Sequence, residues 1–589
     1  MSGLPSQPGN AETTGSDGCR PVIIIVGWDG AVPELLEKFA AKVSIPTVAK
    51  AMKDGVFARL RSTIPPVTAC AWSSFLSGKN PGKTGLFDFV TPRAGGYQFD
   101  YTNGGYRRDR QTDVLRLLNQ AGLRVGCVNV PMTFPPYAVD GFMISGLDAP
   151  DEKSGIALPA EVFDRAQAKV GPYRIDNRHL GSMKTDDDRR SVLEEFKSIE
   201  TRRTDITLAM MEECPVDVLI IIYNATDQVQ HHFWHLMDEN HPAHQRGSRE
   251  VELFRNAIEE IYVHCDKELA RLLRAFPQAD WMLVSDHGAG PTCGPQVRLN
   301  NALAHAGLLS WANKKGSLVS SIMSKVDGIL RRTLSAKQKA LLARLFPSGR
   351  SRLESMSLAE IDYDRTVAFA YEGFTLSPCV WINRQDKFPR GTVASGAEYE
   401  DACRRVEAAL TSLRDPQTGE QVIPRVYRSS EVYSGAFMQE APDLILDWWN
   451  GRTFTITRSH PSHQAESPVL PPVTQAVPGR DITGIHRRDG ILVANGPHLR
   501  QPQAGTLSVA DLHDIAPTVL SLIGRPIPPD MDGRALHDII AGTVTTHPAG
   551  GGAGSPPKGG DGPAVESREY SDEEKALIEQ RLSSLGYIE

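Results

Sequence analysis

Acidic side chains follow three apolar stretches of this sequence, and together they could bind metal ions. Asp29 follows the run at 24–28, Asp227 follows 221–226, and Asp286 follows 283–285. Carboxylates brought to one place repel one another unless a positive charge lies between them, and a divalent metal supplies that charge. A lone Asp at such a position more often caps a helix or forms a turn, so the prediction depends on the three together.

Histidines near these carboxylates strengthen the prediction of a metal site. Asp227 and His231 are four residues apart, which places both on one face of a helix. His287 directly follows Asp286, and His486 precedes a predicted strand. Imidazole and carboxylate together suit zinc, with manganese or iron as alternatives. The other histidines considered are interpreted as surface or core residues: His232, His235, His460, His463 and His498.

Thr68 could supply the reactive group for such a site. It follows Pro65, Pro66 and Val67 and precedes a helical pattern. One interpretation makes it the N-cap of that helix. The other makes it a nucleophile whose hydroxyl a metal activates, with an anion held by the helix N-terminal amides. Spacing alone leaves both open.

Alternating strands and helices must position these residues. Short Val/Ile-rich runs separated by helical patterns predict an α/β fold, with a mainly parallel sheet covered on both faces. Strands are predicted at 21–27, 124–130, 216–222, 281–284, 376–382, 443–447 and 490–494. Helices are predicted at about 32–41, 111–122, 189–214, 250–275 and 508–523. Ligands of such sheets bind at the carboxyl ends of the strands, where the three aspartates fall.

The sequence also predicts how the chain is divided. A basic segment at 312–353 is interpreted either as a helical cap or lid, inserted at about 305–360, or as a solvated surface excursion. A helix is predicted near the end of the chain, where it docks on the body, self-associates or binds another partner. The divisions are a disordered lead at 1–20, a body at 21–541, a Gly/Pro-rich linker at 542–567, and the terminal helix at 568–589.

Composition excludes several classes of protein. The 589 residues carry a formal charge of −7 and only 7% aromatics, which disfavours a general nucleic-acid-binding surface. No apolar run approaches the length of a membrane helix, and the first 20 residues lack the apolar centre of a secretory signal. None of the eight cysteines forms a Cys-x-x-Cys pair. We therefore expect a cytoplasmic protein without a disulfide scaffold.

Five stretches, in order, resemble the alkaline phosphatase superfamily, close to its type I phosphodiesterase/nucleotide pyrophosphatase branch. They are VGWDG, PPVTACAWSSFLSGKNPGKTG, ATDQVQHHFWH, SDHGAG and GIHRRDGILVANGP. The stretches VNVPMTFPP and GFMISG, with the region 511–525, are more similar still to the superfamily's phosphohydrolase/phosphomutase group, which is predicted to be cytoplasmic. The resemblance spans 21–538 and implies a three-layer α/β/α sandwich with a mainly parallel central sheet and an inserted cap.

The resemblance also implies roles for individual residues. One of two metal ions, zinc by preference, would be held by Asp227, His231 and His486. The other would be held by Asp29, Thr68, Asp286 and His287. Thr68 would attack phosphorus to give a phosphothreonine, which water then hydrolyses. The substrate would be a small phosphorylated compound.

Departures from the family pattern leave the substrate open. Thr84 stands where the nucleotide pyrophosphatase branch has a His, and Phe89 where it has a phosphate-contacting Asn. Asn224, Lys79 and Lys83 are candidate replacements. Cleavage of a phosphodiester or pyrophosphate bond is the leading hypothesis, with a phosphomonoesterase or phosphomutase as the alternative. A catalytically silent binding protein is disfavoured because every expected ligand is present.

Overall fold

Strand β1 (Ile23–Trp28) lies at the centre of a nine-stranded sheet in the computed structural model. The structure describes residues 22–93, 95–107, 112–177, 183–312, 358, 360–372, 378–450, 453–477, 481–503, 507–544 and 569–585. The strand order is β20 (Val509–Asp511), β2 (Val56–Arg61), β19 (Asp489–Asn495), β9 (Asp280–Val284), β1, β8 (Val218–Tyr223), β5 (Val125–Val130), β6 (Gly141–Ser145) and β7 (Ala157–Leu158). Only β19 and β7 pair antiparallel to their neighbours.

The central sheet is buried on both faces, and β1 shows why. Its Ile24 and Val26 join one apolar cluster, while the alternate residues Ile23 and Ile25 join another. Side chains alternate between the two faces of a strand, so an unbroken apolar run fits only a sheet covered on both sides.

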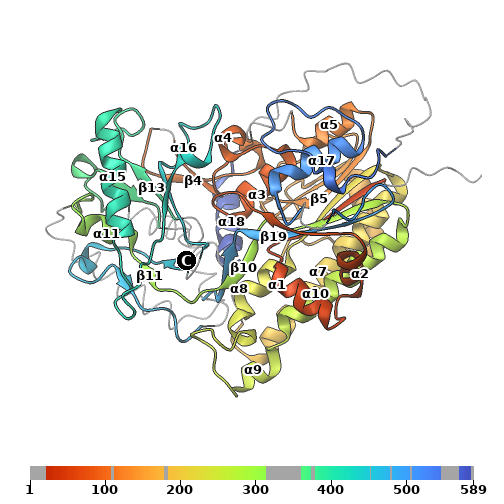
Figure 1. Cartoon of the computed structure of the whole chain (residues 1–589), viewed down its shortest axis with the longest axis horizontal. Helices are drawn as coiled ribbons and strands as arrows, with labels where there is room; N and C mark the ends of the chain where they lie inside the picture. Colours follow the sequence, from red (N-terminus) through yellow and green to blue (C-terminus); the bar gives the residue numbers. More distant parts are fainter. Residues whose placement is uncertain are drawn as a thin grey trace, which may run out of the picture.

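Helices cover each face of this sheet (Figure 1). One face carries α3 (Thr68–Ser77), α5 (Val114–Gln120) and α17 (Ile515–Leu522). The other carries α1 (Pro33–Ala41), α2 (Pro46–Asp54), α7 (Asp186–Glu213), α8 (Ala225–Met237) and α10 (Ala257–Ala275). The predicted three-layer α/β/α sandwich is therefore confirmed.

A second lobe lies beside the sandwich, and its four-stranded antiparallel sheet was not predicted. The sheet order is β12 (Ala368–Ala370), β13 (Cys379–Ile382), β15 (Leu444–Leu446) and β14 (Val426–Arg428), with helices α11 (Leu299–His305) and α15 (Ala397–Thr411). The predicted strands 376–382 and 443–447 thus belong to this lobe and not to the central sheet. Of the predicted insertion at about 305–360, residues 313–357 and 359 lie outside the described residues, as do the predicted lead at 1–20 and nearly all of the linker at 542–567.

Other elements connect or flank these layers. They include β10 (Gly288–Pro291) paired with β18 (Gly484–Arg487), β3 (Val90–Pro92) paired with β4 (Phe99–Tyr101), and β11 (Gln296–Val297) between β16 (Thr455–Ile456) and β17 (Val469–Leu470). Short or peripheral helices are α4 (Pro81–Thr84), α6 (Ala160–Val170), α9 (Arg249–Phe254) and α16 (Ser429–Val432). The helix predicted over 250–275 is thus two helices, α9 and α10, and the one predicted over 508–523 begins as strand β20.

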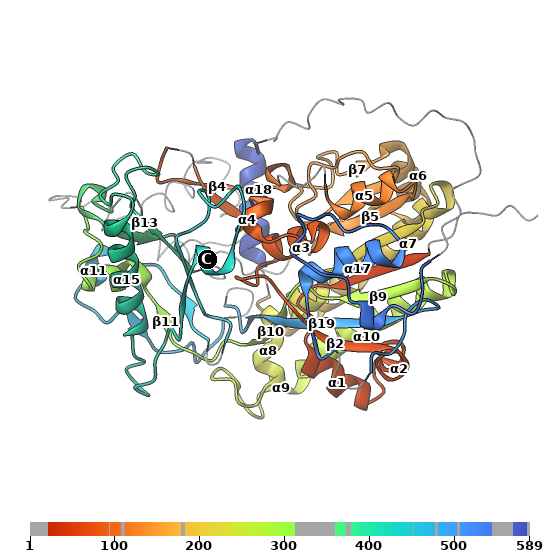
Figure 2. The same cartoon turned by 45° about the horizontal axis from the view of Figure 1, so that its top comes forward.

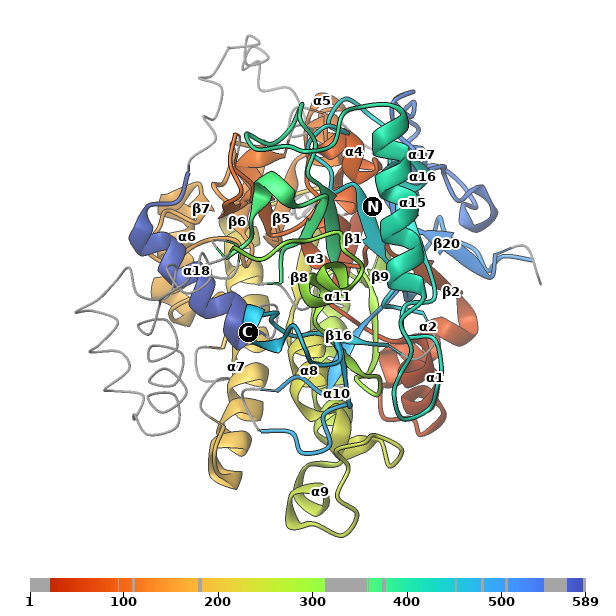
Figure 3. The ribbon, with the colours of Figure 1, turned by 90° about the vertical axis from the view of Figure 1, so that its left-hand side faces the viewer.

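The terminal helix α18 (Asp572–Ser584) packs against its own chain, between the sandwich and the second lobe (Figure 2). Figure 3 shows it running past α6 and α7. Ile578, Leu582 and Leu585 are buried, and the Tyr570 hydroxyl donates to the backbone oxygen of Asp148. Among the described residues, no helix combines the length and apolar character needed to cross a membrane.

Candidate metal centre

The three predicted aspartates meet at one edge of the central sheet. Strands β8, β1 and β9 are adjacent and parallel, so their carboxyl ends lie side by side. Asp29 directly follows β1, and Asp286 follows β9 after one residue. Asp227 lies in the first turn of α8, the helix that follows β8. The topology therefore brings together carboxylates that are far apart in sequence.

The first group of candidate ligands contains Asp227, His231 and His486. Nε2 of His231 lies 3.2 Å from Oδ1 of Asp227, and Nε2 of His486 lies 3.5 Å from the same oxygen. The two Nε2 atoms are 3.1 Å apart. His231 comes from the same helix as Asp227, whereas the pairing of β18 with β10 brings in His486.

The second group contains Asp29, Asp286, His287 and Thr68. Nε2 of His287 lies 3.5 Å from Oδ1 of Asp29 and 3.3 Å from Oδ2 of Asp286. The same nitrogen is 3.2 Å from the hydroxyl oxygen of Thr68. The rings of His287 and His486 stack with centroids 3.5 Å apart, so the two groups adjoin.

Backbone carbonyls fix the orientation of all three imidazoles. Nδ1 of His231 donates to the carbonyl oxygen of Gly484 at 2.8 Å, and Nδ1 of His287 to that of Gly288 at 2.9 Å. Nδ1 of His486 donates to the carbonyl oxygen of Pro66 at 2.9 Å. Because a carbonyl only accepts, Nδ1 carries a proton, and in the neutral imidazole each Nε2 is directed at the carboxylates as a potential ligand.

Unsatisfied buried oxygens show that this donor set fits cations. Oδ1 of Asp29, Oδ1 of Asp227 and Oδ2 of Asp286 are buried, and no described residue donates a hydrogen bond to them. Burial raises the pKa of Asp29 well above its usual range, with Asp286 adding to the rise. Burial, and then Asp227, raise the pKa of Asp286 to about 8. A positive charge bound among these oxygens would favour their ionised forms.

The pKa of Asp227 shifts in the opposite direction from those of Asp29 and Asp286. Burial acts to raise the pKa of Asp227, but the charge of protonated His231 outweighs it and holds that pKa below its usual value. Burial, and then His287, lower the pKa of His486 well below its usual range. Neutral His486 is the form that binds a metal ion.

Sequence reasoning missed two donors that orient the carboxylates. Nε1 of Trp72 donates to Oδ2 of Asp29 at 3.1 Å, and the backbone N–H of Gly30 donates to Oδ1 of Asp286 at 3.2 Å. Trp72 follows Thr68 by four residues and therefore shares a face of α3, which was a readable signal. The Gly30 contact carries no such signal because it depends on the tertiary fold.

Thr68 is the first residue of α3 and not its N-cap. The N-cap is Val67, which makes no side-chain capping hydrogen bond. The capping interpretation is therefore wrong, and the Thr68 hydroxyl faces His287.

Lys79 and Lys83 lie apart from this cluster. Helix α3 has ten residues, so its far end is about 15 Å from Thr68. There Nζ of Lys79 pairs with Asp530 at 2.5 Å, and Nζ of Lys83 pairs with Asp532 at 2.5 Å. These contacts tie α3 and α4 to the loop before 533 and favour a structural role for both lysines.

Asn224 lies at the metal-centre edge of the sheet. It directly follows β8, is 5% exposed, and accepts a hydrogen bond through Oδ1 from Nδ2 of Asn129 at 3.1 Å. Asn129 was not predicted to be functional. Its positive φ of 60° is a conformation that Asn tolerates better than most residues.

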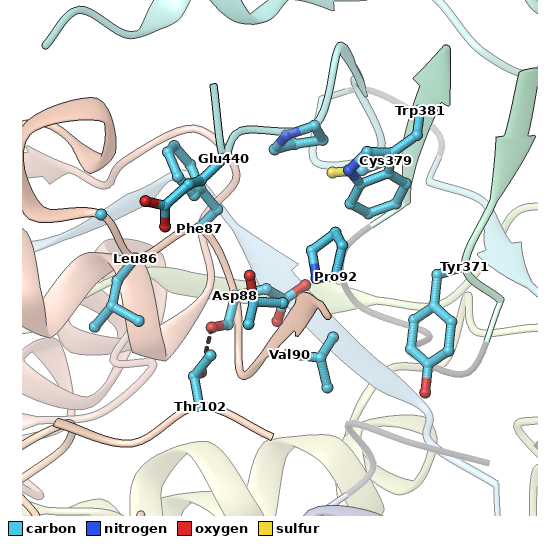
Figure 4. A pocket seen from close by; sticks show the side chains of 13 residues that line it. Leu86, Phe87, Asp88, Val90, Pro92, Thr102, Tyr371, Cys379, Trp381 and Glu440 are labelled. Carbon is cyan, nitrogen blue, oxygen red and sulfur yellow. Dashed lines mark hydrogen bonds between the residues drawn. The ribbon is translucent and has the colours of Figure 1, made fainter. Parts of the chain in front are cut away.

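A separate pocket lies between the segment after α4 and the second lobe (Figure 4). Leu86 and Asp88 lie on one side, and Tyr371 and Trp381 on the other. The pocket contains none of the candidate metal ligands, so it is distinct from the metal centre.

A family model matches most of the chain. The sequence model of the type I phosphodiesterase / nucleotide pyrophosphatase family matches residues 23–468. No curated protein matches the sequence significantly. Among solved structures, phosphonoacetate hydrolase from Sinorhizobium meliloti 1021 with phosphonoacetate is similar at 12% identity and a TM-score of 0.46, over 85% of this chain and 95% of that one. Human ectonucleotide pyrophosphatase / phosphodiesterase 5 is similar at 12% identity and a TM-score of 0.45, over 88% and 99%.

Proposed function

The chain belongs to the type I phosphodiesterase / nucleotide pyrophosphatase family, and we propose that it is a two-metal enzyme cleaving a phosphodiester or pyrophosphate bond through Thr68. One observation carries the proposal. Two groups of buried ligand atoms share an edge of the sheet: Asp227 and His486 with His287, and Asp29 and Asp286 with the same His287. His231 adjoins the first group, with its Nε2 3.2 Å from Oδ1 of Asp227, and the Thr68 hydroxyl lies 3.2 Å from Nε2 of His287. This is an arrangement suited to positioning both a nucleophile and a phosphoryl group.

Zinc is the metal that the donor set suits best. Asp227, His231 and His486 would hold one ion, and Asp29, Asp286, His287 and Thr68 would hold the other. Three imidazoles and three carboxylates form a mixed nitrogen and oxygen set, which zinc accepts readily. When bound, divalent ions polarise the phosphoryl oxygens and lower the pKa of a hydroxyl beside them.

The Thr68 oxygen would carry the reaction in two displacements. In the first, Oγ1 attacks phosphorus and the bond from phosphorus to the leaving oxygen breaks. Thr68 loses its proton in this step, and the leaving oxygen takes up a proton. In the second, water attacks the phosphothreonine, the bond from phosphorus to Oγ1 breaks, and Thr68 regains a proton.

The start of α3 supports this role for Thr68. The first turn of a helix leaves backbone N–H groups without intrahelical partners, and these favour anions. The N–H groups of Ala69 and Cys70 occupy that turn. They would stabilise the charge on the phosphoryl oxygens beside Thr68.

Hydrolysis assays on the metal-loaded full chain test the proposal. We expect zinc-loaded protein to cleave bis-p-nitrophenyl phosphate faster than p-nitrophenyl phosphate, and acid quenching during turnover to trap phosphate on Thr68. Preference for the monoester would instead support a phosphomonoesterase. Absence of turnover with zinc, manganese and iron, or turnover that survives complete metal removal, would refute a two-metal phosphohydrolase.

A further inference from the structure

A buried pair of asparagines lies next to the metal centre. Asn129 sits near the end of β5, where the pairing with β6 shifts register between Val128 and Val130. Such an irregularity redirects a side chain, and these features are common beside active sites. Nδ2 of Asn129 donates to the carbonyl oxygen of Ile222 at 3.0 Å and to Oδ1 of Asn224 at 3.1 Å.

These two contacts fix which way each amide points. The Ile222 carbonyl only accepts, so the Asn129 atom facing it must be nitrogen. The Asn224 atom that faces this nitrogen must then be oxygen. Nδ2 of Asn224 is left buried with no acceptor among the described residues, and Oδ1 of Asn129 is left with no donor there.

The backbone of Asn224 is held as firmly as its side chain. Its N–H and that of Ala225 both donate to Oε1 of Glu200 at 2.9 Å. Glu200 pairs in turn with the fully buried Arg203. Glu200 therefore fixes the backbone at Asn224, and Asn129 fixes the direction of its side-chain amide.

Asn224 also adjoins the ligands on the neighbouring strand. The N–H of Asp29 donates to the carbonyl oxygen of Tyr223, the residue before Asn224, at 2.9 Å. The hydroxyl of Thr226, two residues later, donates to the carbonyl oxygen of Asp29 at 2.6 Å. Asn224 thus lies between β8 and α8, in a segment whose flanking residues hydrogen-bond to the backbone of Asp29.

We propose that Nδ2 of Asn224 donates a hydrogen bond to a non-bridging oxygen of the phosphoryl group, and that Asn129 is the positioning residue that aims it. An N–H donor repels a cation and requires an acceptor, and the phosphoryl oxygen is the acceptor that this reaction brings to the site. The inference rests on the proposed function, because it assumes that phosphate chemistry occurs here. It supplies a substrate contact in a chain that has Phe89 in place of the family's Asn.

Phosphate binding to the zinc-loaded full chain tests the contact without relying on turnover. We expect Asn224→Ala to weaken the binding of inorganic phosphate, measured by calorimetry, roughly 10- to 100-fold. Asn224→Asp should weaken it further, because a carboxylate facing the anion replaces the donor. Asn301→Asp is the matched control. Asn301 is also buried, its Nδ2 has no acceptor within the described part of the chain, and its Oδ1 accepts from a backbone N–H, but it lies on α11 in the second lobe.

A double-mutant cycle tests the positioning role of Asn129. Asn129→Gly removes the amide while allowing the positive φ. We expect it to weaken phosphate binding and lower kcat/KM in the wild-type background but to add little to Asn224→Ala, because both changes remove one interaction. Equal effects of Asn129→Gly in both backgrounds would show a merely structural role.

The outcome that overturns the inference is specific. Phosphate affinity within about twofold of wild type in both Asn224 variants, at unchanged zinc content and Tm, would refute the contact. Lack of phosphate binding to the wild type would also refute it. Failure of the proposed function would be seen separately, as wild-type protein that cleaves neither nitrophenyl substrate.

Discussion

The hydroxyl oxygen of Thr68 lies 3.2 Å from Nε2 of His287, and both side chains are fully buried. Nδ1 of His287 donates to the Gly288 carbonyl, so in the neutral imidazole Nε2 is the acceptor and the Thr68 hydroxyl donates to it. If Thr68 is the nucleophile, Thr68→Ala should lower kcat by about 10³-fold or more while the protein folds and binds metal normally. Steady-state kinetics with bis-p-nitrophenyl phosphate measures this.

Thr68→Ser supplies the control, because it keeps a hydroxyl at the same position. It should retain far more activity than Thr68→Ala. Near-equal activity of Thr68→Ala and wild type would remove Thr68 from the chemical step.

Metal content should respond to changes in one ligand group at a time. Wild type should bind about two zinc ions per chain, and His486→Ala closer to one, because the first group loses a ligand whose Nε2 lies 3.5 Å from Asp227. Elemental analysis after dialysis measures the ratio. His498→Gln is the control, since its imidazole pairs with Asp280 at 2.8 Å outside both groups. Equal zinc in wild type and His486→Ala would exclude His486 as a ligand.

Part of the candidate metal centre could be predicted from local sequence, whereas the assignment of Thr68 and His486 to the two groups came from the family resemblance. Asp29, Asp227 and Asp286 follow apolar runs, and parallel strands must bring such positions to one edge. The carbonyl contacts that orient the histidines could not be predicted, because backbone oxygens carry no residue-specific signal. The role of Asn129 could not be predicted either, because the direction of its side chain depends on how β5 pairs with β6.

The second lobe and the lysines show the limit of local patterns. Strands β12, β14 and β15 have only three residues each. Such short segments show too little alternation of apolar and polar residues to indicate which sheet they join. Lys79 and Lys83 suggested phosphate contacts by charge alone. Their partners, Asp530 and Asp532, lie roughly 450 residues away in sequence, so only the fold reveals the pairing.

Stability should fall in mild acid because His235 is buried as a neutral imidazole. Burial, and then His241, lower its pKa from the usual 6.5 to about 3. Below pH 6.5 the unfolded chain takes up a proton that the folded chain does not, so acid favours unfolding; above 6.5 the contribution is constant. The slope for this one group is at most about 1.4 kcal/mol per pH unit.

Urea unfolding at a series of pH values measures this dependence. His235→Gln should show a shallower fall in unfolding free energy below pH 6.5 than wild type. His537→Gln, at an exposed histidine, should leave the slope unchanged. Identical slopes in wild type and His235→Gln would contradict the assignment.

Arg581 should decide whether α18 stays docked. Its Nε pairs with Asp176 at 2.8 Å, its guanidinium also donates to the carbonyl oxygens of Leu147 and Pro150 at 2.9 and 3.1 Å, and it is 7% exposed. Arg581→Met keeps the bulk but leaves Asp176 buried without its partner, a loss of about 3–5 kcal/mol. An undocked helix of 13 residues is marginal in water, so α18 should open while the sandwich stays folded. Hydrogen exchange of the 572–584 peptide should therefore accelerate strongly, and Asp176→Asn in the same chain should recover part of the protection.

Arg246→Met, at an exposed ion pair with Glu239, should leave the exchange of this peptide unchanged and serves as the control. Unchanged exchange in Arg581→Met would mean that Ile578 and Leu582 hold the helix through apolar contacts alone.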